Sequence, residues 1–152
     1  MNRRYVQKLR EDLRKYSKQI GISQKDMPEL VTDKFRLRKA IMERTGDPSF
    51  STEMYYRYKS KAGICFYGLK IVYVNTHQRY LKNTKKEKIK YRNFRDALIH
   101  ELIHYRFEDE LKHGPEFNHR IKEIVRGKVF PQMKIEEAEE QEKVKGRIYE
   151  FY

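Results

Sequence analysis

Residues 97–114 have the sequence "ALIHELIHYRFEDELKHG", which gathers three histidines in one short segment. Its apolar residues recur at three- and four-residue steps, and this spacing predicts a helix with one buried side. His100 and His104 stand four residues apart, so on a helix their side chains lie one above the other on the same face. The expected fold and the expected chemistry of the chain both depend on this helix.

Two imidazoles on one helical face can bind a single tetrahedral zinc ion. Glu101 lies about 100° further round the helix, where it does not suit a third ligand but can reach a water bound to the metal. Zinc lowers the pKa of such a water to near 7, and the glutamate can accept its proton and hand it to a departing amine. The pattern H-E-x-x-H therefore predicts His100 and His104 as metal ligands and Glu101 as catalytic base. The alternative is a core helix with hydrogen-bonded histidines, which is costly without a metal.

The third ligand has several candidates. The longer pattern H-E-x-x-H-x-x-G-x-x-H fails, because Phe107 and Glu110 occupy the positions of its glycine and its last histidine. His113 comes directly before a Gly-Pro turn that can return its imidazole to the metal, and histidine is a frequent zinc ligand, so His113 is favoured. The other candidates, on the helix that follows, are Glu116 and Glu123. The histidines expected at the surface or beside the ligands are His77 and His119.

Helical periodicity and end signals predict three further helices. These are residues 3–20, ended by Gly21; residues 33–44, capped by Thr32 or Asp33; and residues 115–127, opened by Pro115. Asn93 is expected to cap the helix that contains His100.

The β-rich runs "GICFYG" (63–68) and "LKIVYVN" (69–75) predict adjacent antiparallel strands joined tightly at Gly68. Residues 47–60 are expected to form a loop. Together these segments predict an α+β fold: N-terminal helices, a small antiparallel sheet, the H-E-x-x-H helix and a further helix.

Length and composition limit the alternatives. The 152 residues are enough for one domain. A single cysteine, Cys65, excludes an internal disulfide, as in proteins of a reducing compartment. No 18-residue apolar run and no signal-like N-terminus are present. The sequence therefore predicts an intracellular protein, not secreted and not in a membrane, and we assume a monomer.

A net charge of +13 indicates a polyanionic partner, most often nucleic acid. The basic residues concentrate in the first helix and in the lysine-dense segment 82–92. The expected DNA contacts are Arg3, Arg4, Lys8, Arg14, Lys15, Lys85, Lys86, Lys88 and Lys90.

An ordered set of motifs resembles the SprT-like zinc metalloproteases. The set is "AGIC" (62–65), "LKIVYVN" (69–75), "RDALIHELIHY" (95–105) and "KHGPEF" (112–117). The resemblance covers a core of about residues 55–127. A basic helical part (1–46) precedes this core, and a charged, helix-prone tail (131–152) follows it.

The resemblance implies a zincin-like fold with one zinc ion, held by His100, His104 and His113, with Glu101 as base. It also implies that the strand 69–75 borders the cleft, where an extended substrate can pair with its edge. Eukaryotic members cleave proteins crosslinked to DNA. Many members carry a four-cysteine zinc ribbon, for which these 152 residues lack the cysteines.

The leading hypothesis is therefore a DNA-associated zinc endopeptidase that acts on proteins bound or crosslinked to DNA. One alternative is a non-catalytic, zinc-containing nucleic-acid-binding module, in which Glu101 would have no purpose. The other is a metallopeptidase with a dedicated protein target unrelated to DNA. The role of the acidic tail, including docking as an inhibitor, is left open.

Overall fold

A computed structural model describes residues 3–81, 87–107, 114–131 and 146–149. The helices are α1 (Arg3–Ile20), the short 3₁₀ helix η1 (Gln24–Asp26), α2 (Lys34–Thr45), α3 (Pro48–Tyr58), α4 (Tyr91–Phe107) and α5 (Pro115–Val125). The strands are β1 (Glu29–Val31), β2 (Gly63–Phe66), β3 (Ile71–Val74) and β4 (Gly146–Tyr149). The fold is α+β, as the sequence predicts.

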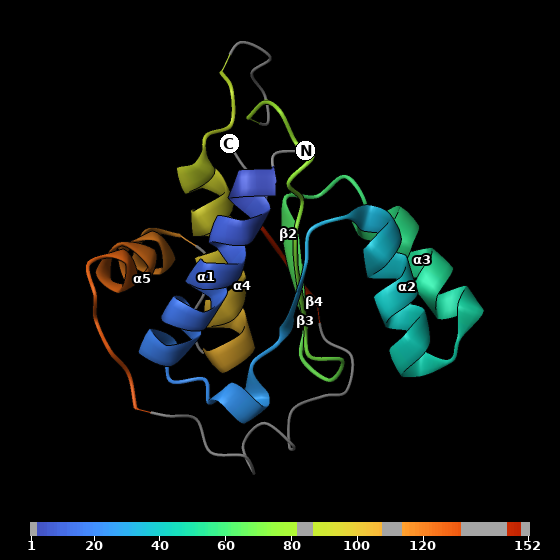
Figure 1. Cartoon of the computed structure of the whole chain (residues 1–152), viewed down its shortest axis with the longest axis horizontal. Coiled ribbons are helices and arrows are strands. Elements are labelled where there is room, and N and C mark those ends of the chain that lie inside the picture. The colour runs from blue at the N-terminus through green and yellow to red at the C-terminus, as the bar shows by residue number, and fades with distance from the viewer. Residues whose placement is uncertain (1–2, 82–86, 108–113, 132–145, 150–152) are drawn as a thin grey trace.

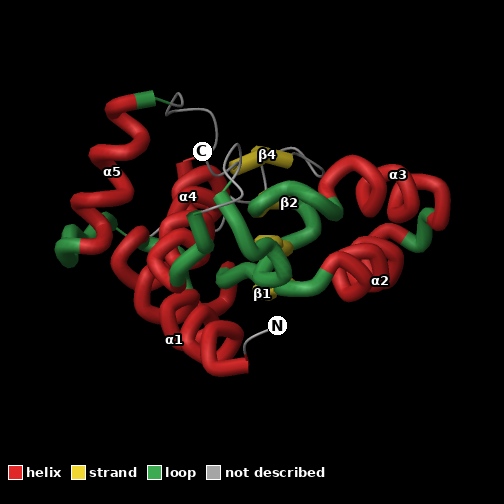
Figure 2. Tube along the Cα trace, turned by 90° about the horizontal axis from the view of Figure 1, so that it is seen from above, coloured by secondary structure: helices red, strands yellow, loops and turns green. Residues whose placement is uncertain are grey.

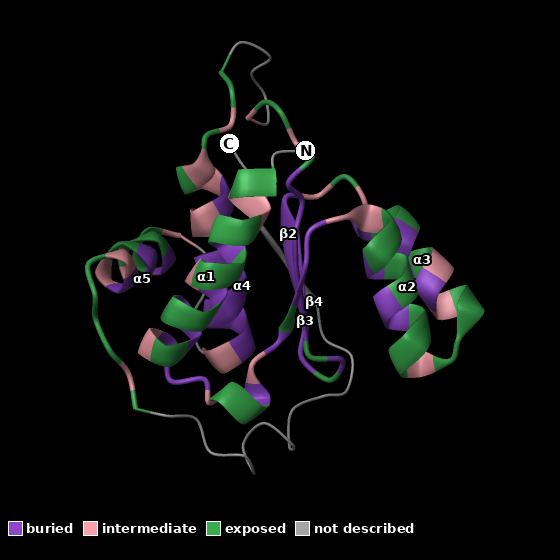
Figure 3. Cartoon of the chain, viewed as in Figure 1, coloured by how far each residue is buried: buried purple, intermediate pink, exposed green. Residues whose placement is uncertain are grey.

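The sheet separates two groups of helices. Figure 1 shows α1, α4 and α5 on one side of the strands and the α2–α3 pair on the other. The strand order is β1-β3-β2-β4. Figure 3 shows that α4 and the strands are largely buried, whereas α1 turns an exposed face outward. The helix that carries the candidate site therefore lies in the interior, between α1 and the sheet.

Alternating side chains of β2 and β3 fill two separate cores, because successive strand residues point to opposite faces. Cys65, Val72 and Val74 join the core under α1, α4 and α5. Ile64 and Tyr73 join the core under α2 and α3. The sheet is thus buried on both faces, which explains why the strand sequences are apolar runs without polar alternation.

The three predicted helices outside the histidine motif are confirmed. Gly21 follows α1 with a φ of 91°, a conformation that glycine adopts without strain. Asp33, one of the two expected caps, accepts the backbone N–H groups of Phe35 and Arg36 at 2.9 and 3.1 Å. Helix α5 begins at Pro115.

Three expectations about local structure are wrong. Residues 48–58 form α3 and not a loop, since Asp47 caps the helix by accepting the N–H of Phe50 at 3.0 Å and Pro48 occupies its first turn. Asn93 does not cap α4 from outside, because the helix begins at Tyr91. Its side chain instead accepts the N–H of Lys90 at 2.8 Å, as the third residue of a capping box does.

The third error concerns the sheet, which is mixed and not purely antiparallel. Strand β2 pairs antiparallel with β3, as predicted. However, β1 pairs parallel with β3, with Leu30 opposite Val72. Strand β1 has only three residues, too few to show a periodicity in the sequence.

Hydrogen bonds from the end of α1 hold α5 in place. The side chain of Gln19 donates to the carbonyl of Ile124 at 2.8 Å, and its own carbonyl accepts the N–H of Phe130 at 2.7 Å. Gly21 lies so close to Pro131 that a Cβ there would be 2.1 Å from the Pro131 carbonyl oxygen. These contacts fix the orientation in which α5 meets α4.

Candidate active site

His100 and His104 converge on one point on the buried side of α4. Their side chains are only 5% and 2% exposed, and their Nε2 atoms lie 3.0 Å apart. Two nitrogens bound to one tetrahedral zinc at about 2.0–2.1 Å are about 3.3 Å apart. The spacing of the two imidazoles therefore fits a shared metal ion, and it equally fits a hydrogen bond between the rings.

Phe117 of α5 closes this point from the neighbouring helix. Its ring centroid lies 4.2 Å from that of His100 and 4.8 Å from that of His104, and its side chain is 1% exposed. Packing against an aromatic ring restricts the rotamers of both histidines. The first turn of α5 thus helps to orient the two candidate ligands.

Glu101 points to a different side of α4, toward β2. It is completely buried, and a Cβ added to Gly63 would lie 3.4 Å from its Cγ and its Oε2 atoms. The same Cβ would lie 2.8 Å from the carbonyl oxygen of Tyr73. A side chain at position 63 would therefore clash with the backbone of β3, whereas glycine lets β2 pack directly against Glu101. Sequence reasoning missed this residue, although a glycine inside a strand is a known signal of close approach.

Strand β2 contacts the candidate base through Gly63. The resemblance implied that residues 69–75 border the cleft, but β3 (Ile71–Val74) is an interior strand, paired with β1 on one side and β2 on the other. The expected pairing of a substrate with the edge of this strand is therefore wrong, because β1 covers the edge of β3 that would have been free in a two-stranded sheet. The outer edge of β2 carries β4.

Two buried tyrosines donate their hydroxyl groups to backbone carbonyls. Tyr105 lies on α4, whereas the side chain of Tyr73 lies on the face of the sheet away from α4. Tyr105 on α4 donates to Asp26 at 2.6 Å, and Tyr73 on β3 donates to Lys59 at 3.3 Å. Burial raises the pKa of both hydroxyls above the ordinary value for tyrosine, so both stay protonated at neutral pH. They act as structural donors between elements.

His113, the favoured third ligand, lies outside the described residues. Among the residues that the structure does describe, no group of three or more His, Cys, Asp or Glu side chains is arranged to hold a metal. Glu116 is exposed in the first turn of α5. Glu123 forms an ion pair with Lys128 at 2.7 Å, and this hydrogen bond from Lys128 lowers the pKa of the Glu123 carboxyl. His119 also contacts Glu123, at 3.5 Å.

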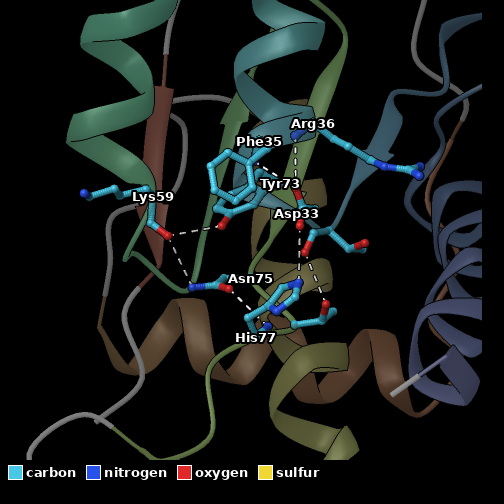
Figure 4. Close-up of polar contacts among 9 residues, drawn as sticks. Asp33, Phe35, Arg36, Lys59, Tyr73, Asn75 and His77 are labelled. Atoms are coloured by element: carbon cyan, nitrogen blue, oxygen red, sulfur yellow. Dashed lines mark hydrogen bonds and ion pairs between the residues drawn. The ribbon is translucent and has the colours of Figure 1, made fainter. Parts of the chain in front are cut away.

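His77 belongs to a polar cluster just beyond the C-terminal end of β3, where Val74 is opposite Gly63; Figure 4 shows the cluster. Its Nε2 atom lies 3.4 Å from the carboxylate of Asp33, and its N–H donates to the side chain of Asn75 at 3.1 Å. The amide of Asn75 reaches the carbonyl of Lys59 at 3.5 Å, which also accepts from Tyr73 (Figure 4). This cluster joins the end of α3 to the end of β3, so it determines where the chain enters β2.

The predicted DNA-contacting residues on α1 are all exposed; they are Arg3, Arg4, Lys8, Arg14 and Lys15. Lys88 and Lys90 are also exposed, whereas Lys85 and Lys86 lie outside the described residues. A hollow of about 400 Å³ is lined by Tyr5 of α1 together with Lys88. The ammonium group of Lys8 lies 4.3 Å from the ring centroid of Tyr91, at the start of α4. The fold therefore brings the two basic segments together.

In the part of the chain that the structure describes, no helix is long and apolar enough to cross a membrane.

Comparison with known proteins gives one match. The model of the SprT-like family matches residues 31–138, a span that includes β2, β3, α4 and α5 and ends before β4. No curated protein and no solved structure matches significantly.

Proposed function

The chain belongs to the SprT-like family, and from this membership we propose that it is a zinc-dependent endopeptidase with Glu101 as its base. The family as a whole is associated with metalloprotease-like activity. The observation that carries the proposal is the convergence of the His100 and His104 Nε2 atoms at 3.0 Å, with the Glu101 carboxylate buried beside them on the same helix.

Three residues are proposed to hold the metal: His100, His104 and His113. Phe117, which contacts both imidazoles, stands only four residues after His113 in the sequence, so the chain has little length in which to move away from the pair. Glu123 is a poorer candidate for the third metal ligand than His113, because its carboxylate already forms an ion pair with Lys128. Zinc bound here would supply a Lewis acid that lowers the pKa of a water and polarises a peptide carbonyl.

Glu101 is proposed to accept the proton of the attacking water and to pass it to the departing amine. Its position against Gly63 directs the carboxylate toward β2. An extended peptide that pairs with the outer edge of β2 would lie next to this carboxylate. Pairing through backbone hydrogen bonds requires no particular side chain, so the cleavage is expected to have weak sequence selectivity.

The proposed substrates are proteins bound or crosslinked to DNA. The support is the net charge of +13 and the clustering of exposed cations on α1 with Lys88 and Lys90. Neutralisation of phosphates by such residues gives an affinity that depends strongly on salt. A dedicated protein target unrelated to DNA would not require this dependence.

The central test is the Glu101→Gln variant. It keeps the shape of the side chain but removes the base, so we expect an unchanged zinc stoichiometry and a loss of cleavage of at least about 100-fold. The assay follows degradation of a protein crosslinked to an oligonucleotide, with free protein as the comparison. Equal cleavage by the variant and the wild type would contradict the mechanism. Bound zinc with no cleavage by either protein would favour a non-catalytic zinc-containing module.

The ligand assignment has its own test, by zinc content alone. His113→Ala is expected to release zinc, whereas Glu116→Ala and Glu123→Ala are matched controls that should keep it. If zinc stays stoichiometric in His113→Ala and leaves in one of the glutamate variants, the third ligand is a carboxylate.

A further inference from the structure

The strand β4 lies beside the candidate site although it comes from outside the matched part of the family. It pairs antiparallel with β2, with Gly63 opposite Tyr149 and Phe66 opposite Gly146. Figure 2 shows β4 beside β2, on the side of the sheet away from β1. The family match ends at residue 138, so this edge strand is an addition to the region that defines the family.

The partner of β4 is the strand that contacts the candidate base. The Glu101 side chain packs against Gly63, and the same Gly63 is opposite Tyr149 in the ladder. Strand β4 also contacts α4. The backbone of β4 therefore runs along the edge of β2 that an extended peptide needs in order to reach Glu101.

Two strands cannot use one edge at the same time. Each strand edge offers a single row of N–H and C=O groups, and an antiparallel partner within the chain satisfies the same groups as a peptide added from outside. A segment of the same chain has the advantage of a high effective concentration, in the millimolar range for short connections. A free peptide must therefore compete with a segment that is always present near the edge at this high effective concentration.

We propose that the outer edge of β2 is the peptide-binding edge of the site and that β4 is its internal occupant, which must leave before a substrate binds. This inference rests on the proposed function, because the edge of β2 binds a substrate only if the protein is a peptidase. Strand β4 has four residues, shorter than a usual strand of five or six, and so few backbone hydrogen bonds are lost when it leaves. Displacement of β4 then regulates access to Glu101.

The single cysteine of the chain provides a direct test. Cys65 lies opposite Arg147 in the β2–β4 ladder, and directly opposed residues share one face of a sheet. In the Arg147→Cys variant, oxidation is expected to join the introduced thiol to Cys65 and lock β4 in place. Ile148→Cys is the matched control. Position 148 is opposite Ile64, and its neighbour Cys65 points to the other face, so oxidation should form no such bond.

Two measurements test the effect of the disulfide between Cys65 and the cysteine introduced at position 147. Binding is measured by fluorescence anisotropy with a labelled synthetic peptide, GRIYEFY, that has the sequence of residues 146–152; this uses the Glu101→Gln background, so that the peptide stays intact. Cleavage is measured with Glu101 present. Oxidised Arg147→Cys is expected to lose at least tenfold in peptide affinity and in cleavage rate, and reductant should restore both. Ile148→Pro, which disrupts pairing of β4, is expected to bind the peptide more tightly than the parent.

The outcomes separate the two proposals. Equal peptide binding by the locked and the reduced protein would overturn the inference, and so would failure of the lock to form under oxidation. If the lock controls peptide binding but the unlocked protein cleaves nothing, the β2 edge binds peptides and the proposed peptidase function is wrong.

Discussion

Gly63 is the residue of β2 that packs against the candidate base. A methyl group at this position would meet the Tyr73 carbonyl oxygen at 2.8 Å and the Glu101 side chain at 3.4 Å. The carbonyl belongs to the sheet and cannot move cheaply, so β2 itself must shift to accept a side chain at position 63. Because the Glu101 side chain packs against Gly63, such a shift would change the surroundings of the candidate base.

Gly63→Ala is expected to lower the cleavage rate at least tenfold, because a shift of β2 disturbs the side chain of Glu101. Zinc content should stay unchanged, since His100 and His104 pack against Phe117 of α5. The variant should also lose some stability, since the sheet is disturbed. Ile41→Val serves as the control: Ile41 is fully buried in the core under α2 and α3, and its truncation costs about 0.5–1.5 kcal/mol. If Ile41→Val lowers cleavage as much as Gly63→Ala does, the effect comes from stability and not from the position of Glu101.

At the scale of elements, α3 illustrates how a cap determines a helix. The segment contains many aromatic residues, which favour strands when considered alone. Asp47 nevertheless accepts the N–H of Phe50, and Pro48 presets the first turn. Met54 and Tyr58 then pack into the core shared with α2.

Removal of this cap tests the explanation. Asp47→Ala is expected to destabilise the protein by about 1 kcal/mol, measured as a lower urea midpoint with an unchanged slope. Asp47→Ser, which can still accept the N–H, should stay close to wild type. Cleavage at low temperature should be unaffected, because α3 lies on the face of the sheet away from α4 (Figure 1). A slope that changes together with the midpoint would show that more than the cap is lost.

At the scale of the whole molecule, the sheet divides the surface into regions with different contacts. One face carries α4 and, outside it, the basic helix α1; the other carries α2 and α3 (Figure 1). Lys8 and Lys15 stand seven residues apart on α1, hence on the same side of the helix, and both are exposed. The proposed DNA surface is therefore on the same side of the sheet as the candidate site.

Neutralising both lysines tests this arrangement. If each contacts one phosphate, Lys8→Gln/Lys15→Gln should reduce the slope of log affinity against log salt by about 1.8, or 0.9 per phosphate. Arg57→Gln/Lys122→Gln removes the same charge from α3 and α5, both at exposed positions. Titration of a labelled oligonucleotide at several salt concentrations gives the slopes. Equal slopes for the two double variants would mean that net charge alone, and not α1, attracts DNA.

Several elements can be predicted from the sequence because their signals are local. The helices over residues 3–20 and 34–45 follow from periodicity, a capping aspartate and a terminal glycine, and the turn at Gly68 joins two strands that are neighbours in the sequence. The four-residue spacing of His100 and His104 suffices to bring their Nε2 atoms together, because a helix repeats that spacing wherever it lies.

The order of the strands and the surroundings of Glu101 depend on how the whole chain folds. Strand β1 joins β3 across some forty residues, and β4 joins β2 across some eighty. Such pairings depend on closing long loops and on burying faces that no local pattern specifies. For this reason the sequence did not predict that β3 is an interior strand. It also did not predict that the strand edge beside the candidate base belongs to β2, or that residues 146–149 cover this edge. The histidine pair is a property of one helix, whereas access to Glu101 is a property of the whole sheet.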